Sequence, residues 1–344
     1  MSARARVAAV IACLDPPGSL VEVVREVRQQ VDRVVVVDDG SLDPTRVFAE
    51  LEASGVTVVH QANAGIAAAL NSGIRVAREG VADVVLTLDQ DSRLGSGYVA
   101  AALATLEAAA AGGIPVAFVS AESYRGRRAP TDGWARGGVG TPTPLDSESG
   151  HLTPRARGVN LPDSESSGPG LARLARAFDP MQSGWVLPVT TLHRVGLFEE
   201  DLVIDGVDSE FTARCRAAGL DPVIGPGCLL EHGQGVRMPV RLLGRPVTVR
   251  GVALAYNRHS PTRVYYMARN GTILTRRHLN RQPAWVLRRL VEEAKAHGIR
   301  LVSDPQRRRL VVAILAGWRD GLAGRTGRIP GDLEHRLRPQ ITPG

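Results

Sequence analysis

The segment VVVVDDGSLDPT, residues 34–45, places four valines directly before two carboxylates, a glycine and a serine. A short unbroken run of β-branched residues is typical of a strand buried on both faces. The polar turn after it suits a ligand, because carboxylates accept hydrogen bonds from a ribose hydroxyl or a pyrimidine N–H, and glycine lets the backbone approach closely. A polar turn with a helix N-cap at Asp43 would explain the same residues. The candidate binding residues are Asp38, Asp39, Gly40 and Ser41.

Short apolar runs alternate with Ala-rich stretches on both sides of this segment. Strands are expected at residues 7–11, 33–37, 56–60 and 84–88, and helices at residues 20–30, 44–54, 66–79 and 97–111. Further on, the pattern predicts a strand over 184–188, a helix over 208–218 and a strand over 222–224. This alternation predicts an α/β fold, with a Rossmann-like, mostly parallel sheet flanked by helices and ligands at the carboxyl ends of the strands.

Composition is that of an ordinary globular protein, since 44% of the 344 residues are apolar and 22% are charged. The three cysteines are too few and too scattered for a disulfide framework or a zinc cluster, which favours a cytoplasmic location. The apolar run near the N-terminus stops at Asp15 and is interpreted as a strand rather than a signal peptide. No apolar run approaches the roughly 20 residues that cross a bilayer as a helix.

The chain is expected to have two parts. Residues 1–262 would form the ligand-binding domain, with a Gly- and Pro-rich loop or insertion at about 125–170. Residues 263–344 would form a basic, amphipathic helical region, and 269–344 alone hold sixteen Lys or Arg against six Asp or Glu. Such helices either pack on their own domain or lie on the inner face of an anionic membrane. Nucleic acid is not an expected partner, because aromatic residues are only 4% of the chain.

A second carboxylate pair ends another apolar strand in VLTLDQDSRL, residues 85–94. Asp89 and Asp91 are two positions apart, so an extended chain would place both on one side. Two converging carboxylates are costly to ionise together unless a divalent cation lies between them, and Mg²⁺ or Mn²⁺ bridging a diphosphate fits oxygen ligands. Pairs of this kind are also common in turns, so the position after a parallel strand gives the pattern its weight.

Two more segments carry polar groups at expected turns. Asn63 and Gly65 form a tight turn before a small-residue helix, and the polar Asn71 on that helix has no obvious packing reason. Residues 201–210 hold an acidic cluster that opens another helix. Acidic residues stabilise a helix N-terminus without any catalysis. The apolar neighbours nevertheless suggest a half-buried pocket in which one carboxylate serves as a general base.

These four segments, in this order and spacing, resemble glycosyltransferase family 2 with a GT-A fold. LTLDQDS (86–92) and VIDGVDSEFTARCRAAG (203–219) are similar to its bacterial rhamnosyltransferase branch. Two later pieces agree with that branch, namely EHGQG (231–235) and HSPTRVYYMARN (259–270). The resemblance covers roughly residues 6–118 and 178–275.

The resemblance implies an inverting transferase that moves a sugar, L-rhamnose from dTDP-rhamnose, to a hydroxyl of a glycan or polyprenyl-linked acceptor. Asp38 and Asp39 would then hold the nucleoside, and Asp91, supported by Asp89, a metal on the diphosphate. Asp208 would be the catalytic base, with Asp205 beside it. Arg263 and Arg269 could pair with phosphates, although arginine on a helix is more often a solvated charge. His232 could be a metal or phosphate ligand, or a structural histidine.

Three alternatives remain open. Another family 2 transferase could use a UDP- or GDP-sugar. A sugar nucleotidyltransferase shares the sheet and a two-carboxylate metal site, but it generally needs an early basic phosphate loop, and residues 12–20 contain no Arg or Lys. A non-catalytic nucleotide-binding module would have no need of Asp208.

Overall fold

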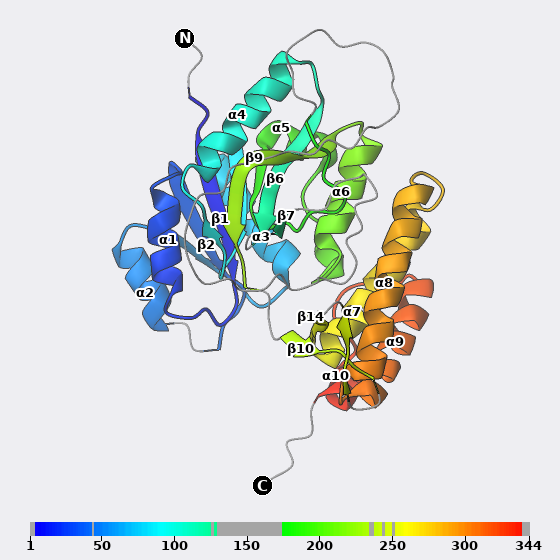
Figure 1. Cartoon of the computed structure of the whole chain (residues 1–344). Helices are drawn as coiled ribbons and strands as arrows, with labels where there is room; N and C mark the ends of the chain where they lie inside the picture. Colours follow the sequence, from blue (N-terminus) through cyan, green and yellow to red (C-terminus); the bar gives the residue numbers. More distant parts are fainter. Residues whose placement is uncertain are drawn as a thin grey trace, which may run out of the picture.

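The first four strands confirm the predicted parallel sheet in the computed structural model. They are β1 (Val7–Cys13), β2 (Arg33–Asp38), β3 (Thr57–His60) and β4 (Val84–Asp89). They lie in the order β3-β2-β1-β4, and every pair is parallel (Figure 1). The carboxyl ends of β2 and β4 therefore lie at one edge, which brings the two predicted carboxylate turns to the same side of the sheet.

The other half of the sheet is mixed. Beyond β4 the order is β8-β6-β9-β5, and β8 (Trp185–Pro188) runs antiparallel to both of its neighbours. β6 (Val116–Tyr124) is parallel to β9 (Asp221–Glu231), and the short β5 (Arg93–Leu94) pairs antiparallel with β9. β7 (Arg127–Arg128) pairs with β6, which gives this sheet nine strands within the described residues.

Sequence patterning missed β6 and ended β9 too early. β6 alternates poorly because its buried positions include serine, and Ser120 satisfies its hydroxyl by donating to the carbonyl of Val223 at 3.1 Å. β9 contains Gly225 and Gly227, residues that usually end a strand. The strand continues because a register shift accommodates the irregular segment.

Helices cover both faces of the sheet. Alternate residues of β1 point to opposite faces and pack into two separate cores. Val7, Ala9 and Ile11 face one core. The helices of that core are α1 (Leu20–Arg28), α2 (Thr45–Ala53) and α4 (Tyr98–Ala111). Ala8 and Val10 face the other core. Its helices are α3 (Ile66–Glu79), α5 (Val189–Val195), which was not predicted, and α6 (Val207–Ala217), preceded by the 3-10 turn η1 (Glu200–Leu202).

Four helices follow the sheet, and they pack together at its lower right in Figure 1. They are α7 (Pro261–His278), α8 (Pro283–Ser303), α9 (Arg307–Leu322) and α10 (Gly331–Leu337). The apolar spacing of this region predicts helices over residues 265–274, 285–295 and 309–322; α7, α8 and α9 confirm them and are longer. Residues of α7, α9 and α10 share a core that also includes Val203 from the acidic segment. The predicted boundary between residues 262 and 263 remains a prediction, since α7 itself contacts the sheet domain.

Short hairpins link β9 to these helices. Their strands are β10 (Arg237–Pro239), β11 (Arg241–Leu242), β12 (Arg245–Pro246), β13 (Thr248–Val249), β14 (Val252–Ala253) and β15 (Ala255–Asn257). β10 pairs with β15, which returns the chain to the start of α7.

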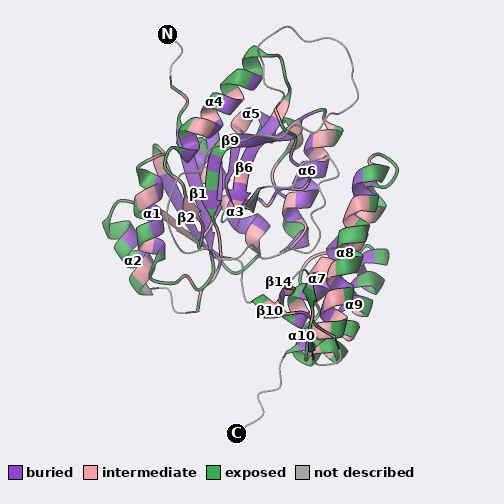
Figure 2. Cartoon of the chain, viewed as in Figure 1, coloured by how far each residue is buried: buried purple, intermediate pink, exposed green. Residues whose placement is uncertain are grey.

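The structure describes residues 4–42, 45–124, 127–128, 174–233, 237–242, 245–249 and 252–338. Most of the predicted 125–170 loop, together with Asp43 and part of the 231–235 motif, lies outside these residues. In the described part, no helix has the length and apolarity needed to cross a membrane. All three cysteines are buried and free. The strands at the centre of the sheet are largely buried, whereas the helices around it expose their outer faces (Figure 2).

Candidate active site

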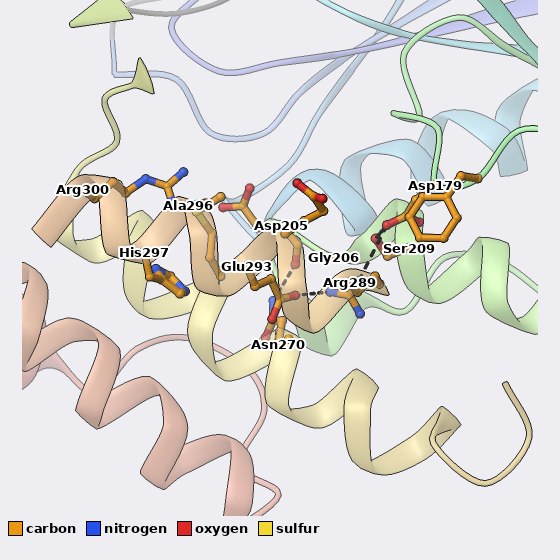
Figure 3. A pocket seen from close by; sticks show the side chains of 14 residues that line it. Asp179, Asp205, Gly206, Ser209, Asn270, Arg289, Glu293, Ala296, His297 and Arg300 are labelled. Carbon is orange, nitrogen blue, oxygen red and sulfur yellow. Dashed lines mark hydrogen bonds and ion pairs between the residues drawn. The ribbon is translucent and has the colours of Figure 1, made fainter. Parts of the chain in front are cut away.

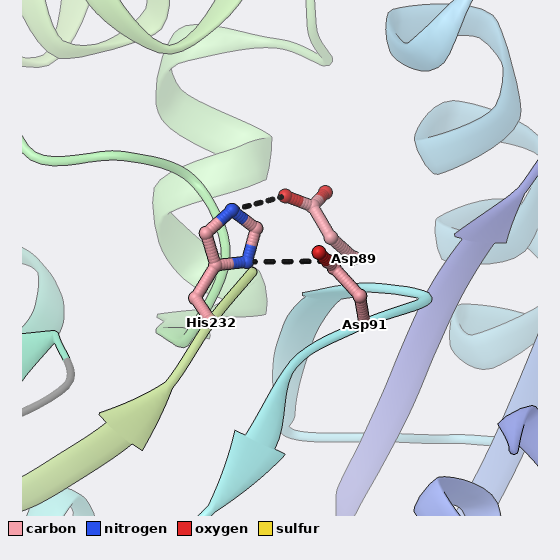
Figure 4. A group of neighbouring side chains, drawn as sticks. All are labelled: Asp89, Asp91 and His232. Atoms are coloured by element: carbon pink, nitrogen blue, oxygen red, sulfur yellow. Dashed lines mark ion pairs between the residues drawn. The ribbon is translucent and has the colours of Figure 1, made fainter. Parts of the chain in front are cut away.

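Three metal-binding side chains converge at the carboxyl end of β4. Asp89 is the last residue of β4, Asp91 follows in the turn to β5, and His232 comes directly after β9. Antiparallel pairing of β5 with β9 brings His232 across to the aspartates (Figure 4). One candidate ligand atom of each residue lies within 4.8 Å of the others. His232 Nδ1 is 3.3 Å from Asp91 Oδ1, and His232 Nε2 is 3.9 Å from Asp89 Oδ2.

Neighbouring polar groups hold this Asp89–Asp91–His232 group in place. The Gln182 amide donates to Asp89 Oδ1, and Ser183 Oγ accepts from the Asp89 backbone N–H at 3.0 Å. Ser92 Oγ lies 2.8 Å from His232 Nδ1. A Cβ atom at residue 233 would lie 2.0 Å from Asp91 Oδ2, so a larger residue there would push the Asp91 side chain aside. Asp89 and His232 are therefore oriented by neighbouring groups before any ion binds.

The donor set fits a divalent cation. Burial raises the pKa of Asp89, His232 acts against that shift, and the charge of Asp91 raises it further. Ionising both carboxylates at this site is therefore unfavourable without a positive charge between them. Two carboxylates and one imidazole suit a divalent metal that accepts oxygen and nitrogen ligands.

The first carboxylate turn, after β2, has its hydrogen bonds already made. Asp38 Oδ1 accepts from the backbone N–H of Ser41 at 2.9 Å and from its hydroxyl at 2.6 Å, while Oδ2 lies 3.0 Å from His60 Nδ1. Burial acts to raise the pKa of Asp38, but the bonds from Ser41 and His60 hold it below its ordinary value. Asp38 is thus an ionised, nearly buried carboxylate that shapes the turn.

Asp39 ties this turn to the Asn63–Gly65 turn. Its carboxylate accepts from the Gln61 amide and from the backbone N–H groups of Ala64 and Gly65, each at 2.8 Å. A Cβ atom at Gly40 would lie 2.5 Å from the backbone nitrogen of Asn63, so the two turns touch only because residue 40 is glycine. The sequence-predicted residues Asp38, Asp39, Gly40, Ser41, Asn63 and Gly65 therefore form one surface.

Asn71 has a structural explanation. It is fully buried, its Nδ2 donates to the carbonyl of Phe198 and to Glu200 Oε1, and its Oδ1 accepts from the Phe198 N–H, all at 2.8 to 2.9 Å. The side chain joins α3 to the chain that leads into the acidic segment. The polar residue on this helix is a bridge between two elements of the site.

Asp208, which is half-buried, lies in the first turn of α6 beside a second half-buried carboxylate, Asp179. Burial and the charge of Asp179 raise the pKa of Asp208 to about 7. Asp179 accepts from Ser209 Oγ at 2.8 Å and lies 3.7 Å from Arg289, yet its Oδ1 is buried without a partner in the described residues. A carboxylate with a pKa near neutrality is suited to accept a proton.

Arg263 lies within electrostatic range of both Asp208 and the metal-binding group. Its guanidinium donates to both carboxylate oxygens of Asp205 at 3.0 to 3.2 Å. Burial acts to lower the pKa of Arg263, but nearby carboxylates outweigh it and raise the pKa. Asp205 contributes most to that rise, followed by Asp89 and Asp208. The same cation is therefore within electrostatic range of both predicted catalytic elements.

The segment between η1 and α6 has a strained backbone. Val203 and Asp205 have φ of 65° and 61°, in the left-handed region that residues with a Cβ rarely adopt. Asn270 stabilises this conformation, because its Nδ2 donates to the carbonyls of Leu202, Ile204 and Asp205 at 2.7 to 2.9 Å. Such strain is typical of functional segments that the surrounding structure fixes in place.

Arg269 lies on the buried side of this arrangement. It has no exposed surface, donates to backbone carbonyls that include Leu202 O and Gly327 O, and stacks over the rings of Tyr265 and Tyr266. From sequence, a phosphate contact and a solvated charge were both open for Arg269, and the phosphate contact stays a prediction. We propose a positioning role for Arg269 instead, because its guanidinium is enclosed by protein.

Several functional candidates were missed from sequence. Gln182 and Ser183 orient Asp89, and Asp179 raises the pKa of Asp208. Gln182 and Ser183 could have been noticed from sequence, because two polar residues just before a buried strand need hydrogen-bond partners. Asp179 gave no signal, since its effect depends on burial.

Comparison with known proteins agrees with this geometry. Residues 9–159 match the model of a family described as Glycosyl transferase family 2. The dTDP-rhamnosyl transferase RfbF of Shigella flexneri is 25% identical over 278 residues, which are 78% of this chain and 80% of that protein.

Solved structures resemble the chain in fold at low identity. GalNAc-T7 with UDP, GalNAc and Mn²⁺ superposes with a TM-score of 0.50 at 12% identity, over 94% of this chain and 57% of that one. This chain thus spans little more than half of that protein. S. aureus TarS 1-349 in complex with UDP-GlcNAc gives a TM-score of 0.44 at 12% identity, over 93% of this chain and 92% of that one. The sheet, the carboxylate group at its edge and the match over residues 9–159 lead to one conclusion: the chain has a GT-A fold and is similar to family 2 glycosyltransferases, among them a bacterial rhamnosyltransferase.

Proposed function

We propose that the chain is an inverting glycosyltransferase that moves L-rhamnose from dTDP-rhamnose to a hydroxyl of a glycan or polyprenyl-linked acceptor, with Mg²⁺ or Mn²⁺. The observation that carries this proposal is the convergence of Asp89, Asp91 and His232 next to a base candidate, Asp208, with which they share Arg263. The relative from Shigella flexneri, a dTDP-rhamnosyl transferase by name, supports the choice of donor.

The donor would lie on the surface formed by the two joined turns. Asp38 and Asp39 are hydrogen-bond acceptors at the floor of this surface, beside the backbone of Gly40 and Ser41. Each carboxylate oxygen can accept more than one hydrogen bond, so a nucleoside hydroxyl or N–H can add to the existing bonds. Asn63 is held from the far side by Arg328, which donates to its carbonyl oxygens.

Asp89, Asp91 and His232 would hold the divalent cation on the donor's diphosphate. When bound, the cation neutralises the charge that develops on the leaving phosphate oxygens. The protein's own contribution is to orient these ligands through Gln182 and Ser183 and to keep them close together.

Asp208 would act as the general base. The acceptor oxygen attacks the anomeric carbon from the face opposite the diphosphate, the new carbon–oxygen bond forms as the bond to phosphate breaks, and the acceptor proton passes to Asp208. One displacement inverts the anomeric configuration and needs no sugar–enzyme intermediate. A pKa of about 7 leaves a useful fraction of Asp208 ionised near neutral pH while keeping it basic enough to take the proton.

A donor panel tests the proposal. Purified protein is offered thymidine, uridine and guanosine diphosphate sugars with Mg²⁺ or Mn²⁺, and thermal shift and diphosphate release are measured. We expect the largest metal-dependent shift with dTDP-rhamnose. A larger shift with a UDP- or GDP-sugar would replace the donor but keep the enzyme class, whereas no metal-dependent shift with any donor would contradict the site.

We also propose that α9 places the enzyme on an anionic membrane surface. Val311, Leu315, Trp318 and Leu322 are exposed and lie on one face of α9 at helical spacing. At 100° per residue, the exposed Arg307 and Arg308 lie on either side of this stripe. An apolar stripe bordered by arginines matches the acyl boundary and anionic headgroups of a bilayer.

Flotation with vesicles containing anionic lipid tests this second proposal. We expect the protein to float at low salt, to be released by high salt, and to float less after Trp318→Ser or Arg308→Gln. Equal flotation with neutral and anionic vesicles, or none at low salt, would contradict it.

A further inference from the structure

A cavity adjoins the metal-binding group. It is a cavity of about 580 Å³ between β15, α7 and α8. His232 and Gly233 form part of its wall, so it opens beside the Asp89–Asp91–His232 group. Its size is in the range of ordinary ligand pockets, roughly 300–1,000 Å³. We call this cavity the basic pocket.

Positive charge dominates the described lining of the basic pocket. It includes five cationic side chains and one carboxylate, which are Arg237, Arg258, Arg263, Lys295, Arg300 and Glu292. Three of the cations already have carboxylate partners: Arg258 with Asp304, Arg263 with Asp205, and Lys295 with Glu292. Arg237 and Arg300 make no side-chain hydrogen bond or ion pair within the described residues.

Arg300 is the informative residue. Only 7% of it is exposed, and its Nε is buried without a hydrogen-bond partner among the described residues. Figure 3 shows Arg300 at one end of a second, neighbouring cavity, which it lines together with the carboxylates Asp179, Asp205 and Glu293. A buried cation without a direct partner is costly, and this cost is relieved when an anion binds.

His259, which also lines the basic pocket, lies in the same positively charged surroundings. Burial lowers the pKa of His259 to about 4, and the charges of Arg263 and Arg300 lower it further. His259 is therefore neutral near pH 7 and does not add to the positive charge. A bound anion would lie among guanidinium groups that bind phosphate oxygens in a planar, two-bond geometry.

We propose that the basic pocket binds a phosphoryl group carried by the acceptor. This inference rests on the proposed function, since it takes the pocket to be the acceptor side of a transferase. The position beside the metal-binding group, the excess of cations and the unpartnered Arg300 all favour a phosphate or diphosphate ester over a neutral glycan.

Binding of inorganic pyrophosphate to metal-free full-length protein tests this, with titration calorimetry as the readout. Without divalent metal, the proposed donor site lacks its main phosphate contact, so binding should report the basic pocket. We expect Arg300→Gln to weaken pyrophosphate binding about 10- to 100-fold, as expected for a lost charge-assisted hydrogen bond. Arg237→Gln should weaken it less, because Arg237 is exposed. The matched control is Arg308→Gln, an exposed arginine of α9 outside the pocket.

Two further arms separate the sources of the phosphoryl group. A sugar 1-phosphate should compete with pyrophosphate while the free sugar should not, and metal-dependent dTDP binding should be unchanged in Arg300→Gln. An equal loss of dTDP binding would assign the pocket to the donor and overturn the proposal. So would metal-free protein that binds no pyrophosphate, or a loss of the same size in Arg308→Gln. If Arg300→Gln does not fold, Arg237→Gln and Lys295→Gln decide. Loss of metal-dependent dTDP-rhamnose binding is a separate readout and would contradict only the proposed function.

Discussion

The two acidic regions of the site differ in how their carboxylates are satisfied. After β2, Asp38 and Asp39 take hydrogen bonds from neighbouring side chains and backbone, and the pKa of Asp38 is lowered. Around β4 and α6, Asp89 and Asp208 are half-buried beside other carboxylates, and their pKa values are raised. In the first region, hydrogen bonds satisfy the carboxylates and shape the turn surface. In the second region, the ionised carboxylates are unfavourable until a cation, a proton or a substrate binds to them.

Asp208→Asn is expected to have the largest effect, because it removes the proposed general base from the second region. Because the amide cannot accept the acceptor's proton, we expect kcat to fall about 10²- to 10⁴-fold, while donor and metal binding stay close to normal. Steady-state kinetics and donor titration measure the two effects. Asp332→Asn, also in the first turn of a helix but exposed, is the control. Full activity in Asp208→Asn would remove this residue from the mechanism.

Asp91→Ala should abolish most metal-dependent donor binding. Loss of one ligand from the Asp89–Asp91–His232 group leaves two, and we expect affinity for dTDP with Mn²⁺ to fall about 10²-fold or more. Calorimetric titration with and without chelator measures it. Exposed Asp201 offers the control variant Asp201→Ala, and equal affinity in Asp91→Ala and the unmodified protein would contradict the metal site.

Asn71→Ala tests stability rather than chemistry. It would leave the buried Phe198 N–H and carbonyl without partners, so we expect a loss of about 2–4 kcal/mol in the free energy of unfolding. Urea denaturation measures it, and the exposed Asn280→Ala should cost less than about 0.5 kcal/mol. Similar losses in both variants would show that the bridge between α3 and the acidic segment is unimportant.

The pH dependence is the smallest and most specific test. Since Asp208 must be ionised to act as a base, kcat/KM should fall about tenfold per pH unit below about pH 7. The same raised pKa has the opposite effect on stability. Ionised Asp208 is unfavourable in the folded state, so this penalty is absent below about pH 4 and grows until about pH 7. Asp208→Asn should therefore raise the urea midpoint more at pH 8 than at pH 4, and a pH-independent difference would contradict the raised pKa.

Sequence patterning predicted the regular half of the fold and named candidate site residues, but not how the structure holds them. The parallel strands β1 to β4 were predictable because buried runs with helices between them leave few arrangements. The reversed β8, with β6 beside it, was not, because strand direction depends on pairing across some 65 residues of chain. Asp89, Asp91, His232 and Asp208 could be named from sequence, since motif spacing carries them. The enclosed position of Arg269 was not predictable, because burial by later helices leaves no local pattern.

The contacts of Asn270 and Arg269 with the strained segment after η1 have a consequence for the modular evolution of this enzyme. The helix that begins at Pro261 carries both the side chains that fix the loop before Asp208 and part of the lining of the basic pocket. A different C-terminal region could therefore not be exchanged for this one to change the acceptor without also supplying new supports for that loop. Acceptor choice and the integrity of the catalytic loop would have to evolve together.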